Sequence, residues 1–254
     1  DRVVKLTTIY DQDGNTIPTT YVYTFYEDQE SGRVWVGSFS GVFNFNPKDV
    51  FDNDFRGYRI KVARNDGTNQ ADYLLDGIPV YAISADGANR KWIGTASSGV
   101  FLIQITTNEM GGKDIETVAH FTTENSLMRS DNVLSIAINE LSGEVFIGTV
   151  AGLVSYMSDA IEPEENFNNL YAYPNPVHPT YRGHITIKGL MVDTQVRILD
   201  AAGNLVKILE GQGGAAVWDG NNARGQRVAS GVYTAVCNTK SGENHSTVKI
   251  LIMN

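Results

Sequence analysis

The sequence of 254 residues contains a single cysteine and no long apolar run. One cysteine excludes an internal disulfide framework, so a hydrophobic core has to hold the fold. Cys237 lies in the apolar stretch 232–237, where we expect a small buried side chain rather than a reactive thiol. No stretch approaches the roughly 20 apolar residues that cross a bilayer, and we predict no membrane span.

Motifs that carry common enzyme chemistry are also missing. There is no Gly-x-Ser-x-Gly nucleophile motif, no phosphate-binding loop and no His-Glu-x-x-His metal motif. The histidines lack a carboxylate or a second histidine at metal-ligand spacing, and we expect surface or turn positions for all four: His120, His178, His184 and His245. We therefore predict a non-enzymatic protein with no catalytic residue, no metal site and no cofactor.

Three weaker patterns leave alternatives open. Residues 11–15, Asp-Gln-Asp-Gly-Asn, place side-chain oxygens at alternate positions as a calcium loop does. They lack the glycine and the closing glutamate of an EF-hand, and they also fit a turn. Exposed aromatic rings would stack on sugars, and two carboxylates would serve as a glycosidase acid and base. The candidates are Phe39, Tyr58 and Tyr73 for stacking and Asp72, Asp76 and Asp86 for catalysis, although we expect core aromatics and solvated loop charges.

Charge is divided unevenly along the chain. Residues 1–165 carry 24 Asp and Glu against 12 Lys and Arg, whereas residues 166–254 carry 5 against 8. An acidic surface repels phosphate groups, which argues against nucleic acid as a partner. The change of sign near residue 165 also predicts a domain boundary.

Three segments of the acidic part, 33–45, 90–102 and 144–156, repeat one pattern. Each has an aromatic residue, an aliphatic residue, glycine and Ser or Thr, followed by a second glycine and another apolar run. The aromatic positions Trp35, Trp92 and Phe146 are 57 and 54 residues apart, and an alternating strand pattern precedes each segment. Repeats of this length built from short strands are typical of β-propeller blades.

The glycines of the repeat have two expected roles. The first (Gly37, Gly94, Gly148) allows a close approach of backbone, and the second (Gly41, Gly99, Gly152) provides a turn with positive φ. Over about residues 15–158 the pattern resembles the propeller repeat of two-component regulators. Propellers close with about four to eight blades. Because the chain has three and begins without methionine or leader, we expect part of a larger propeller whose other blades come from a longer chain or another copy.

Beyond the repeats the pattern changes. Residues 161–169 are short, polar and acidic, which predicts a linker. Short strands separated by sharp turns follow at 170–173, 184–188, 195–199, 205–209, 215–218, 231–238 and 246–252, as in an Ig-like sandwich. We predict an all-β chain: a partial β-propeller of three four-stranded blades over 1–160, a linker over 161–169 and an Ig-like β-sandwich over 170–254.

Several motifs follow one another in this second part. They are Tyr173-Pro-Asn-Pro-Val, Val196-Arg-Ile-Leu-Asp, Trp218-Asp-Gly, Gly225 through Ser-Gly-Val-Tyr233, and Lys249-Ile-Leu-Ile. The succession is similar to the type A C-terminal sorting domain of Bacteroidetes proteins exported by the type IX (Por) secretion system. The turns and strands of any sandwich would account for some of these residues, and flagellar hook-cap proteins carry a similar module.

Propeller repeats followed by this sandwich resemble the PorZ-like family, most closely around residues 121–127, 155–160 and 171–176. The resemblance implies a non-enzymatic component of the type IX secretion and attachment machinery, exported through the periplasm to the cell surface. It implies other secretion and attachment proteins as partners, including a sortase-like protease, and anionic lipopolysaccharide or other surface polysaccharide as ligand.

Two alternatives to this function stay open. One is a secreted propeller enzyme or glycan-binding protein that carries a sorting domain. The other is an extracytoplasmic sensor propeller, which the sandwich at the end of the chain disfavours. The sequence leaves open the ligand, the binding residues, the oligomeric state, the number of further blades and whether the sorting domain is cleaved.

Overall fold

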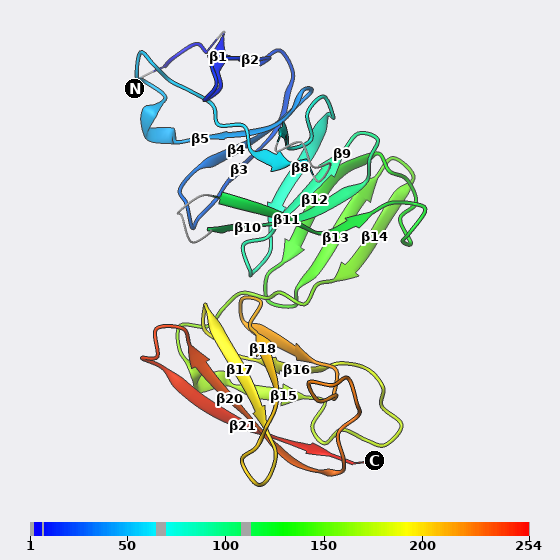
Figure 1. Ribbon diagram of the computed structural model, residues 1–254. Helices are drawn as coiled ribbons and strands as arrows, with labels where there is room; N and C mark the ends of the chain where they lie inside the picture. The colour runs from blue at the N-terminus through cyan, green and yellow to red at the C-terminus, as the bar shows by residue number, and fades with distance from the viewer. Residues whose placement is uncertain (1–2, 7, 65–69, 108–112, 254) are drawn as a thin grey trace. The chain divides into compact units, whose positions relative to one another are not determined.

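The computed structural model describes residues 3–6, 8–64, 70–107 and 113–253. Contacts divide the chain into two compact units (Figure 1). The first comprises Asp1–Ala85, Asn89–Ile138 and Val145–Tyr156, and the second comprises Asp86–Ala88, Asn139–Glu144 and Met157–Asn254. The described residues form strands and two short 3₁₀ turns, which confirms the predicted all-β class.

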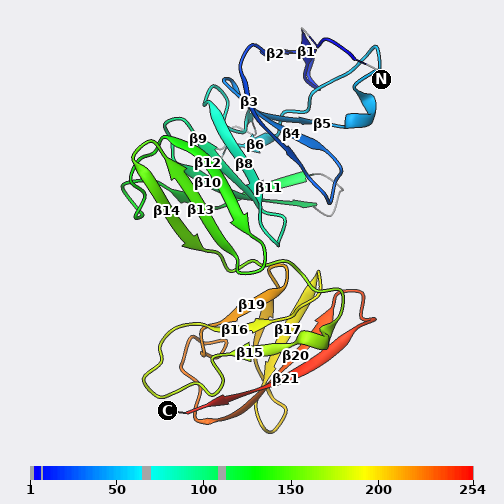
Figure 2. The same cartoon turned by 180° about the vertical axis from the view of Figure 1, so that it is seen from behind.

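Three antiparallel sheets make up most of the first unit. They are β3(Val22–Glu27)-β4(Val34–Ser38)-β5(Gly41–Phe45), β8(Val80–Ala85)-β9(Lys91–Thr95)-β10(Val100–Thr107)-β11(Lys113–Phe121), and β12(Val133–Asn139)-β13(Glu144–Thr149)-β14(Gly152–Met157). Two short hairpins accompany them, β1(Ile9–Tyr10)-β2(Thr16–Ile17) and β6(Lys61–Ala63)-β7(Ala71–Tyr73). Figure 2 shows the three larger sheets following one another in chain order.

The number of strands per blade differs from the prediction. Of the three blade sheets in the described residues, only the second has four strands. After β5 the chain enters the turn η1(Pro47–Asp49), and a single bridge between Asn44 and Tyr58 is all that extends the first sheet. After β14 the chain continues into the second unit, so the third sheet ends at three strands.

The aromatic residues of the first two repeats fill the space between successive sheets, whereas Phe146 of the third repeat is half-buried. Trp35 is buried in a core with Val80 and Ile93 of the second sheet. Trp92 is fully buried in a core with Val133 and Ile147 of the third sheet. Burying a tryptophan removes a large apolar surface from water, so these residues contribute strongly to the stacking of the sheets.

The residue after the first glycine of each repeat closes the hairpin that follows. The hydroxyls of Ser38, Thr95 and Thr149 donate to the carbonyl oxygens of Gly41, Gly99 and Gly152 at 3.0, 2.9 and 2.8 Å. Each of these second glycines has a positive φ, of 117°, 70° and 126°. The predicted turn role of the second glycine is therefore confirmed.

The second unit is a sandwich of two sheets, β15(Tyr171–Tyr173)-β16(Ile185–Lys188)-β19(Ala215–Trp218) and β18(Leu205–Glu210)-β17(Thr194–Leu199)-β20(Gly231–Thr239)-β21(His245–Ile252). All seven predicted strands are present, and the Ig-like sandwich is confirmed. One core of buried side chains, including Trp218, Ile198 and Ile250, lies between the sheets. Phe167 of the turn η2(Phe167–Asn169) packs against this core.

The sequence motifs of the sandwich have identifiable structural roles. Asn175 lies between the two prolines of the Tyr-Pro-Asn-Pro-Val motif. Its Nδ2 donates to the carbonyl oxygen of Lys249, and its Oδ1 accepts from the N–H of Leu251. Trp218 donates its indole N–H to the carbonyl oxygen of Asn221. The hydroxyl of Tyr233 donates to the carbonyl oxygen of Ala229, an arrangement typical of the tyrosine corner in Ig-like folds.

Candidate ligand-binding surface

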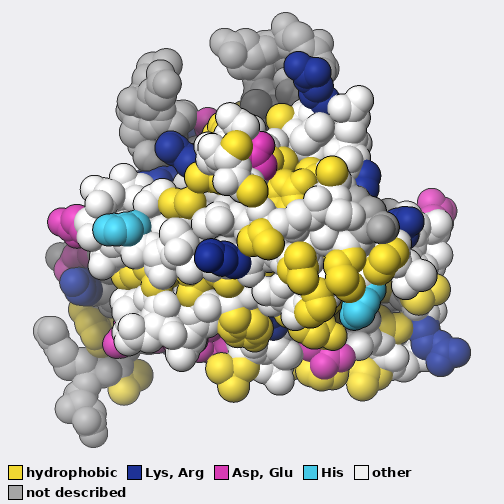
Figure 3. All heavy atoms as spheres, turned by 90° about the horizontal axis from the view of Figure 1, so that it is seen from below, with side chains coloured by type: hydrophobic (Ala, Val, Ile, Leu, Met, Phe, Trp, Pro, Cys, Tyr) yellow, Lys and Arg dark blue, Asp and Glu magenta, His cyan; other side chains and the backbone are white. Residues whose placement is uncertain are grey.

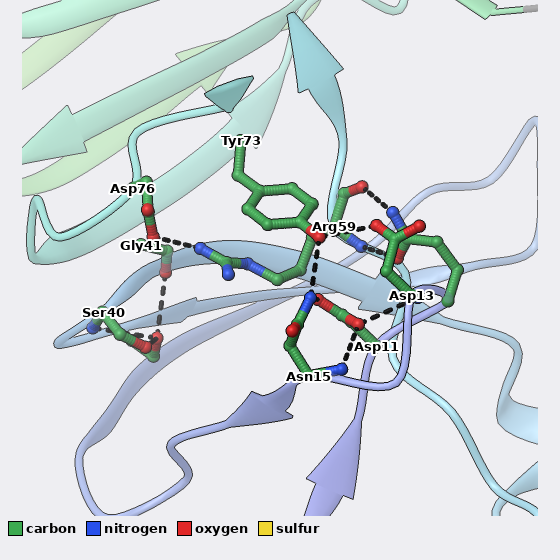
Figure 4. Close-up of polar contacts among 10 residues, drawn as sticks. Asp11, Asp13, Asn15, Ser40, Gly41, Arg59, Tyr73 and Asp76 are labelled. Atoms are coloured by element: carbon green, nitrogen blue, oxygen red, sulfur yellow. Dashed lines mark hydrogen bonds and ion pairs between the residues drawn. The ribbon is translucent and has the colours of Figure 1, made fainter. Parts of the chain in front are cut away.

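The stretch predicted as a turn or a calcium loop lies between β1 and β2 (Figure 4). Asp11 is buried, and its Oδ1 accepts the backbone N–H groups of Asp13 and Asn15 at 2.9 and 2.8 Å. Burial acts to raise the pKa of Asp11, but the hydrogen bonds from Asn15 and Asp13 outweigh it and the pKa lies below its ordinary value. Asp11 therefore serves as the acceptor that shapes this turn.

Asp13 is neutralised by protein groups. Its carboxylate accepts a hydrogen bond from the hydroxyl of Tyr73 at 2.6 Å and another from the ammonium of Lys61 at 2.9 Å. The Lys61 hydrogen bond is the main cause that lowers the pKa of Asp13, and the same contact raises the pKa of Lys61. The hydrogen bond to Asp13, followed by burial, raises the pKa of Tyr73 to about 12.

This arrangement favours a turn over a calcium loop. The Lys61 ammonium contacts the carboxylate that a cation would need, so calcium would have to displace it. Among the described residues, no group of three or more His, Cys, Asp and Glu side chains could hold a metal ion.

Arg59 ties the turn to the neighbouring hairpin. Its guanidinium lies 3.9 Å from the centre of the Tyr73 ring and forms an ion pair with Asp76 (Figure 4). The Gln12 amide pairs with the backbone of Arg59 in both directions, at 2.7 and 2.9 Å. Because Arg59 lies on its ring, Tyr73 is a poor candidate for stacking on a sugar.

The carboxylates proposed as an acid and base pair are held separately. Asp76 pairs with Arg59, whereas Asp72 accepts from Nε of Arg64 at 2.7 Å. The Arg64 hydrogen bond is the main cause that lowers the pKa of Asp72, so this group stays ionised and is a poor general acid. Asp86 is buried and accepts the N–H of Ala88 at 3.1 Å.

A cluster of four aromatic residues is the better candidate for ligand contact. We call Tyr21, Tyr23, Phe39 and Tyr81 the aromatic surface. Tyr21 and Phe39 are 61 % and 59 % exposed with ring centres 6.2 Å apart. Tyr23 is 42 % exposed and meets Tyr81 edge to face at 4.7 Å. Burial, followed by the nearby Tyr81 and Tyr21 phenols, raises the pKa of Tyr23.

The repeat positions this surface. Tyr23 and Tyr81 occupy equivalent places, each second in the first strand of its sheet. Each lies at a shift of pairing register, between Val22 and Thr24 or between Val80 and Ala82. Such a bulge turns a side chain away from the regular alternation. The backbone N–H of Phe39 donates to the carbonyl oxygen of Tyr21 at 2.9 Å.

The structure therefore corrects the list of candidate aromatics. Of the three named from sequence, Phe39 belongs to the surface and Tyr73 is covered by Arg59. Tyr58 is 41 % exposed, with the Arg33 guanidinium 5.8 Å from its ring centre. Sequence reasoning missed Tyr21, Tyr23 and Tyr81, although the repeated Val-Tyr pair at 22–23 and 80–81 was a usable signal.

The cysteine and the histidines take no part in this surface. Cys237 is fully buried, and burial raises the pKa of its thiol to about 12, which confirms the expectation of an unreactive side chain. His120 stacks on Phe101 at 3.9 Å, and the other three histidines are exposed. Within the described residues, no helix has the length and apolar character that a membrane crossing requires.

Blade-like sheets followed by an Ig-like sandwich define an all-β protein of two kinds of domain, and comparison with known proteins shows which proteins it resembles. Residues 181–243 match the family model of the FlgD Ig-like domain. No curated protein matches the sequence. Among solved structures, PorZ, an essential surface component of the type-IX secretion system of Porphyromonas gingivalis, matches over 99 % of this chain with a TM-score of 0.62 and 28 % sequence identity.

The chain is thus similar to PorZ in fold and sequence, and it spans about a third (33 %) of the length of PorZ. The extracellular domain of a hybrid two-component system from B. thetaiotaomicron matches with 12 % identity, coverage of 97 % and 36 % of the two chains and a TM-score of 0.33. Latent PorU from P. gingivalis matches with 12 % identity, coverage of 87 % and 24 % and a TM-score of 0.25. At these TM-scores neither of the latter two bears on function.

Proposed function

We propose that the chain is a non-enzymatic binding component of the type IX secretion and attachment machinery at the cell surface. The observation that carries the proposal is the similarity to PorZ over 99 % of the chain at 28 % identity. Its partners are other proteins of that machinery, including a sortase-like protease. The carboxylates of Asp72 and Asp76 favour a binding role over glycosidase chemistry, because each forms an ion pair with a different arginine.

The sandwich over 170–254 is proposed to carry the export address, with the blades over 1–160 presenting the binding surface. The motifs that resemble a type IX sorting domain support this role. Asn175 and Val177 bond to the last strand, β21, so the Tyr-Pro-Asn-Pro-Val motif and the C-terminal Lys-Ile-Leu-Ile motif form one structural element. A receptor that reads both motifs would then recognise a folded surface rather than a linear tail.

The aromatic surface is proposed to bind glycan. Tyrosine combines an apolar ring face, which packs on the C–H groups of a sugar, with a hydroxyl that bonds to sugar hydroxyls. Residues 1–165 are acidic, with 24 Asp and Glu against 12 Lys and Arg, and would repel an anionic polymer. We therefore assign neutral sugar units to the aromatic surface, and contact with anionic lipopolysaccharide to the sandwich over 170–254, where Lys and Arg outnumber Asp and Glu by 8 to 5.

Deletion of the gene in its native host tests the secretion role. We expect cargo with type IX sorting domains to lose its attachment to the cell surface, and plasmid-borne wild type to restore it. Normal export and anchoring of that cargo in the deletion strain would contradict the proposed role. A secreted enzyme or a sensor would instead leave cargo attachment intact and change glycan turnover or transcription.

Glycan contact is tested with variants of the aromatic surface. Tyr23→Ala and Phe39→Ala remove exposed rings, and Tyr58→Ala removes an exposed ring outside the surface. On arrays of bacterial surface glycans, we expect binding by the wild type and by Tyr58→Ala but not by the other two. Equal binding by all four proteins would rule out the aromatic surface as the site.

A further inference from the structure

Charge does not mark a surface for a partner on the face shown in Figure 3, where basic and acidic side chains lie scattered among apolar patches. Apolar contact is the better guide, and the repeat of the first unit offers an internal standard for it. The first sheet packs against the second, and the second against the third, through equivalent positions of the repeat. A position that lacks its usual neighbour can therefore be recognised by comparing the repeats.

The third sheet, β12-β13-β14, lacks the cover that the first two sheets have. The aliphatic residue directly after the second glycine of the repeat is Val42, Val100 or Leu153. Val42 and Val100 are 3 % and 0 % exposed and belong to the cores between successive sheets. Leu153 is 65 % exposed. The side of the third sheet that faces away from the second is therefore open at a position that the other repeats bury.

The glycines of the third repeat are open in the same way. A Cβ built on Gly41 or Gly99 would clash with the backbone of another segment, whereas on Gly152 it would have a single atom of the described residues within 4 Å, at 3.5 Å. At the first glycine of the repeat, a valine of the next sheet fills the space in the first two repeats. At Gly148 the three nearest atoms all belong to Ser135 of the same sheet.

The first sheet is open on the opposite side. The fourth residue of its first strand, Phe25, is 65 % exposed. The equivalent residue of β8, Ile83, is buried in the core that contains Trp35. The equivalent residue of β12, Ile136, packs against the core that contains Trp92. Phe25 thus has the position of an apolar side chain that packs on a preceding sheet, and it has no such cover.

The first residue of the same strands follows this pattern. Val80 and Val133 are fully buried beside the preceding sheet, whereas Val22 is only partly buried. The β1-β2 hairpin packs on β4 and β5 of the first sheet and leaves Phe25 exposed. The two ends of the row of sheets therefore expose the two complementary halves of one repeated contact.

We propose that the open side of the third sheet binds the first sheet of a second copy of this chain. Val22 and Phe25 of one copy, which we call the leading face, would pack on Phe146, Gly148 and Leu153 of the other, which we call the trailing face. Val22 would take the space beside Gly148, as the first valine does at the other two contacts, and Phe25 would cover Leu153. The contact continues the stacking that already joins the sheets within one chain.

Two copies would close a ring. Each copy supplies three blade sheets, so two copies supply six, which lies within the range of about four to eight in propellers, whereas three copies would supply nine. Because the leading and trailing faces differ, the contact is head-to-tail, and a head-to-tail contact forms a ring when its rotation closes. The proposal concerns the first unit alone and is independent of the secretion role and of glycan binding.

Sedimentation velocity of the whole chain, at concentrations from about 1 to about 100 μM, tests the proposal. We expect a reversible dimer. Leu153→Asp and Phe25→Asp should each raise its Kd more than about tenfold, because a carboxylate would be buried in an apolar contact. Both side chains are exposed in the single chain, so the melting temperature of the monomer should not change. Leu205→Asp is the matched control, because it places the same charge at a leucine of the sandwich that is 55 % exposed.

Mixing the two variants tests the head-to-tail geometry. Leu153→Asp keeps the leading face intact and Phe25→Asp keeps the trailing face intact, so an equimolar mixture retains one sound contact and should associate more tightly than either variant alone. A mixture that associates no more tightly, assemblies larger than a dimer, or an equal loss with Leu205→Asp would overturn the proposal. A monomer at every concentration would also overturn it and would leave the open side of the third sheet to a blade of a longer chain.

Discussion

Val133 of the third sheet occupies the space next to Gly94 of the second: a Cβ built on Gly94 would lie 2.6 Å from Val133 Cγ1. The same relationship recurs one repeat earlier, where a Cβ on Gly37 would lie 2.8 Å from Val80 Cγ1. The first glycine of the first and second repeats therefore leaves room for the first valine of the next sheet. At Gly148, in the third repeat, the nearest atom is instead Oγ of Ser135 in the same sheet, at 2.5 Å.

We expect Gly94→Ala to destabilise the first unit by about 1–3 kcal/mol, the usual cost of forcing extra atoms into a packed core. Gly148→Ala is the matched control, because the Ser135 hydroxyl can rotate away and the cost should be smaller. Urea unfolding followed by tryptophan fluorescence would measure both, since Trp35 and Trp92 report on the first unit. Equal midpoints for the two variants would contradict the proposed role of the glycine.

A buried ion pair supports the same unit. Lys91 is 1 % exposed, with Nζ 3.5 Å from Asp28 Oδ1 and 3.0 Å from the carbonyl oxygen of Asn89. Asp28→Ala removes the carboxylate from beside a buried ammonium, and we expect the variant to destabilise the unit by up to about 3–5 kcal/mol. The double variant Asp28→Ala/Lys91→Met should recover part of this loss. A thermodynamic cycle of the three variants measures the coupling, and additive effects would show that the pair contributes little.

The same pair predicts a dependence on pH. Burial acts to raise the pKa of Asp28, but the Ser31 hydroxyl and the Lys91 ammonium outweigh it, so the folded-state pKa lies below the ordinary value. The stabilising contribution of Asp28 is therefore fully present above the unfolded pKa of about 3.9 and is lost as the pH falls through the folded pKa. When the pH is lowered from 6 to below the folded-state pKa of Asp28, we expect the urea midpoint of the wild type to fall more than that of Asp28→Asn.

The repeat was predictable from sequence because each of its residues answers a steric demand. Trp35 and Trp92 fill the space between sheets, and Gly41 and Gly99 adopt a φ that other residues avoid. Such demands leave the same mark at every repeat. No comparable sequence pattern distinguished the sheets that lack a fourth strand. In the first sheet, the single bridge at Tyr58 follows an irregular segment.

The aromatic surface was less accessible to sequence reasoning. Tyr23 and Tyr81 lie at register shifts, where strict alternation of inward and outward side chains no longer holds.

Calcium addition tests the interpretation of residues 11–15. A weak extracellular calcium site with a Kd of about 10⁻⁴ M would raise the free energy of unfolding by about 2.7 kcal/mol when free calcium is about a hundred times the Kd. Because Lys61 and Tyr73 already satisfy Asp13, we expect no change in melting temperature. Lys61→Ala is the companion variant, because it removes the ammonium that contacts Asp13. A calcium-dependent rise for wild type would reinstate the loop as a metal site.

The last prediction concerns Asn175, whose side chain replaces backbone pairing that its proline neighbours cannot supply. Its amide bonds to the backbone of Lys249 and Leu251 at 2.8 and 3.0 Å. Asn175→Ala would leave both backbone groups of β21 without these partners, and we expect a loss of about 1–3 kcal/mol. The loss should be local, with faster amide hydrogen exchange at Leu251 and its neighbours than in β17. Asn168→Ala, at an exposed position in η2, should change neither. Unchanged exchange at Leu251 in Asn175→Ala would show that the parallel pairing of Val177 with Ile252 holds the last strand by itself.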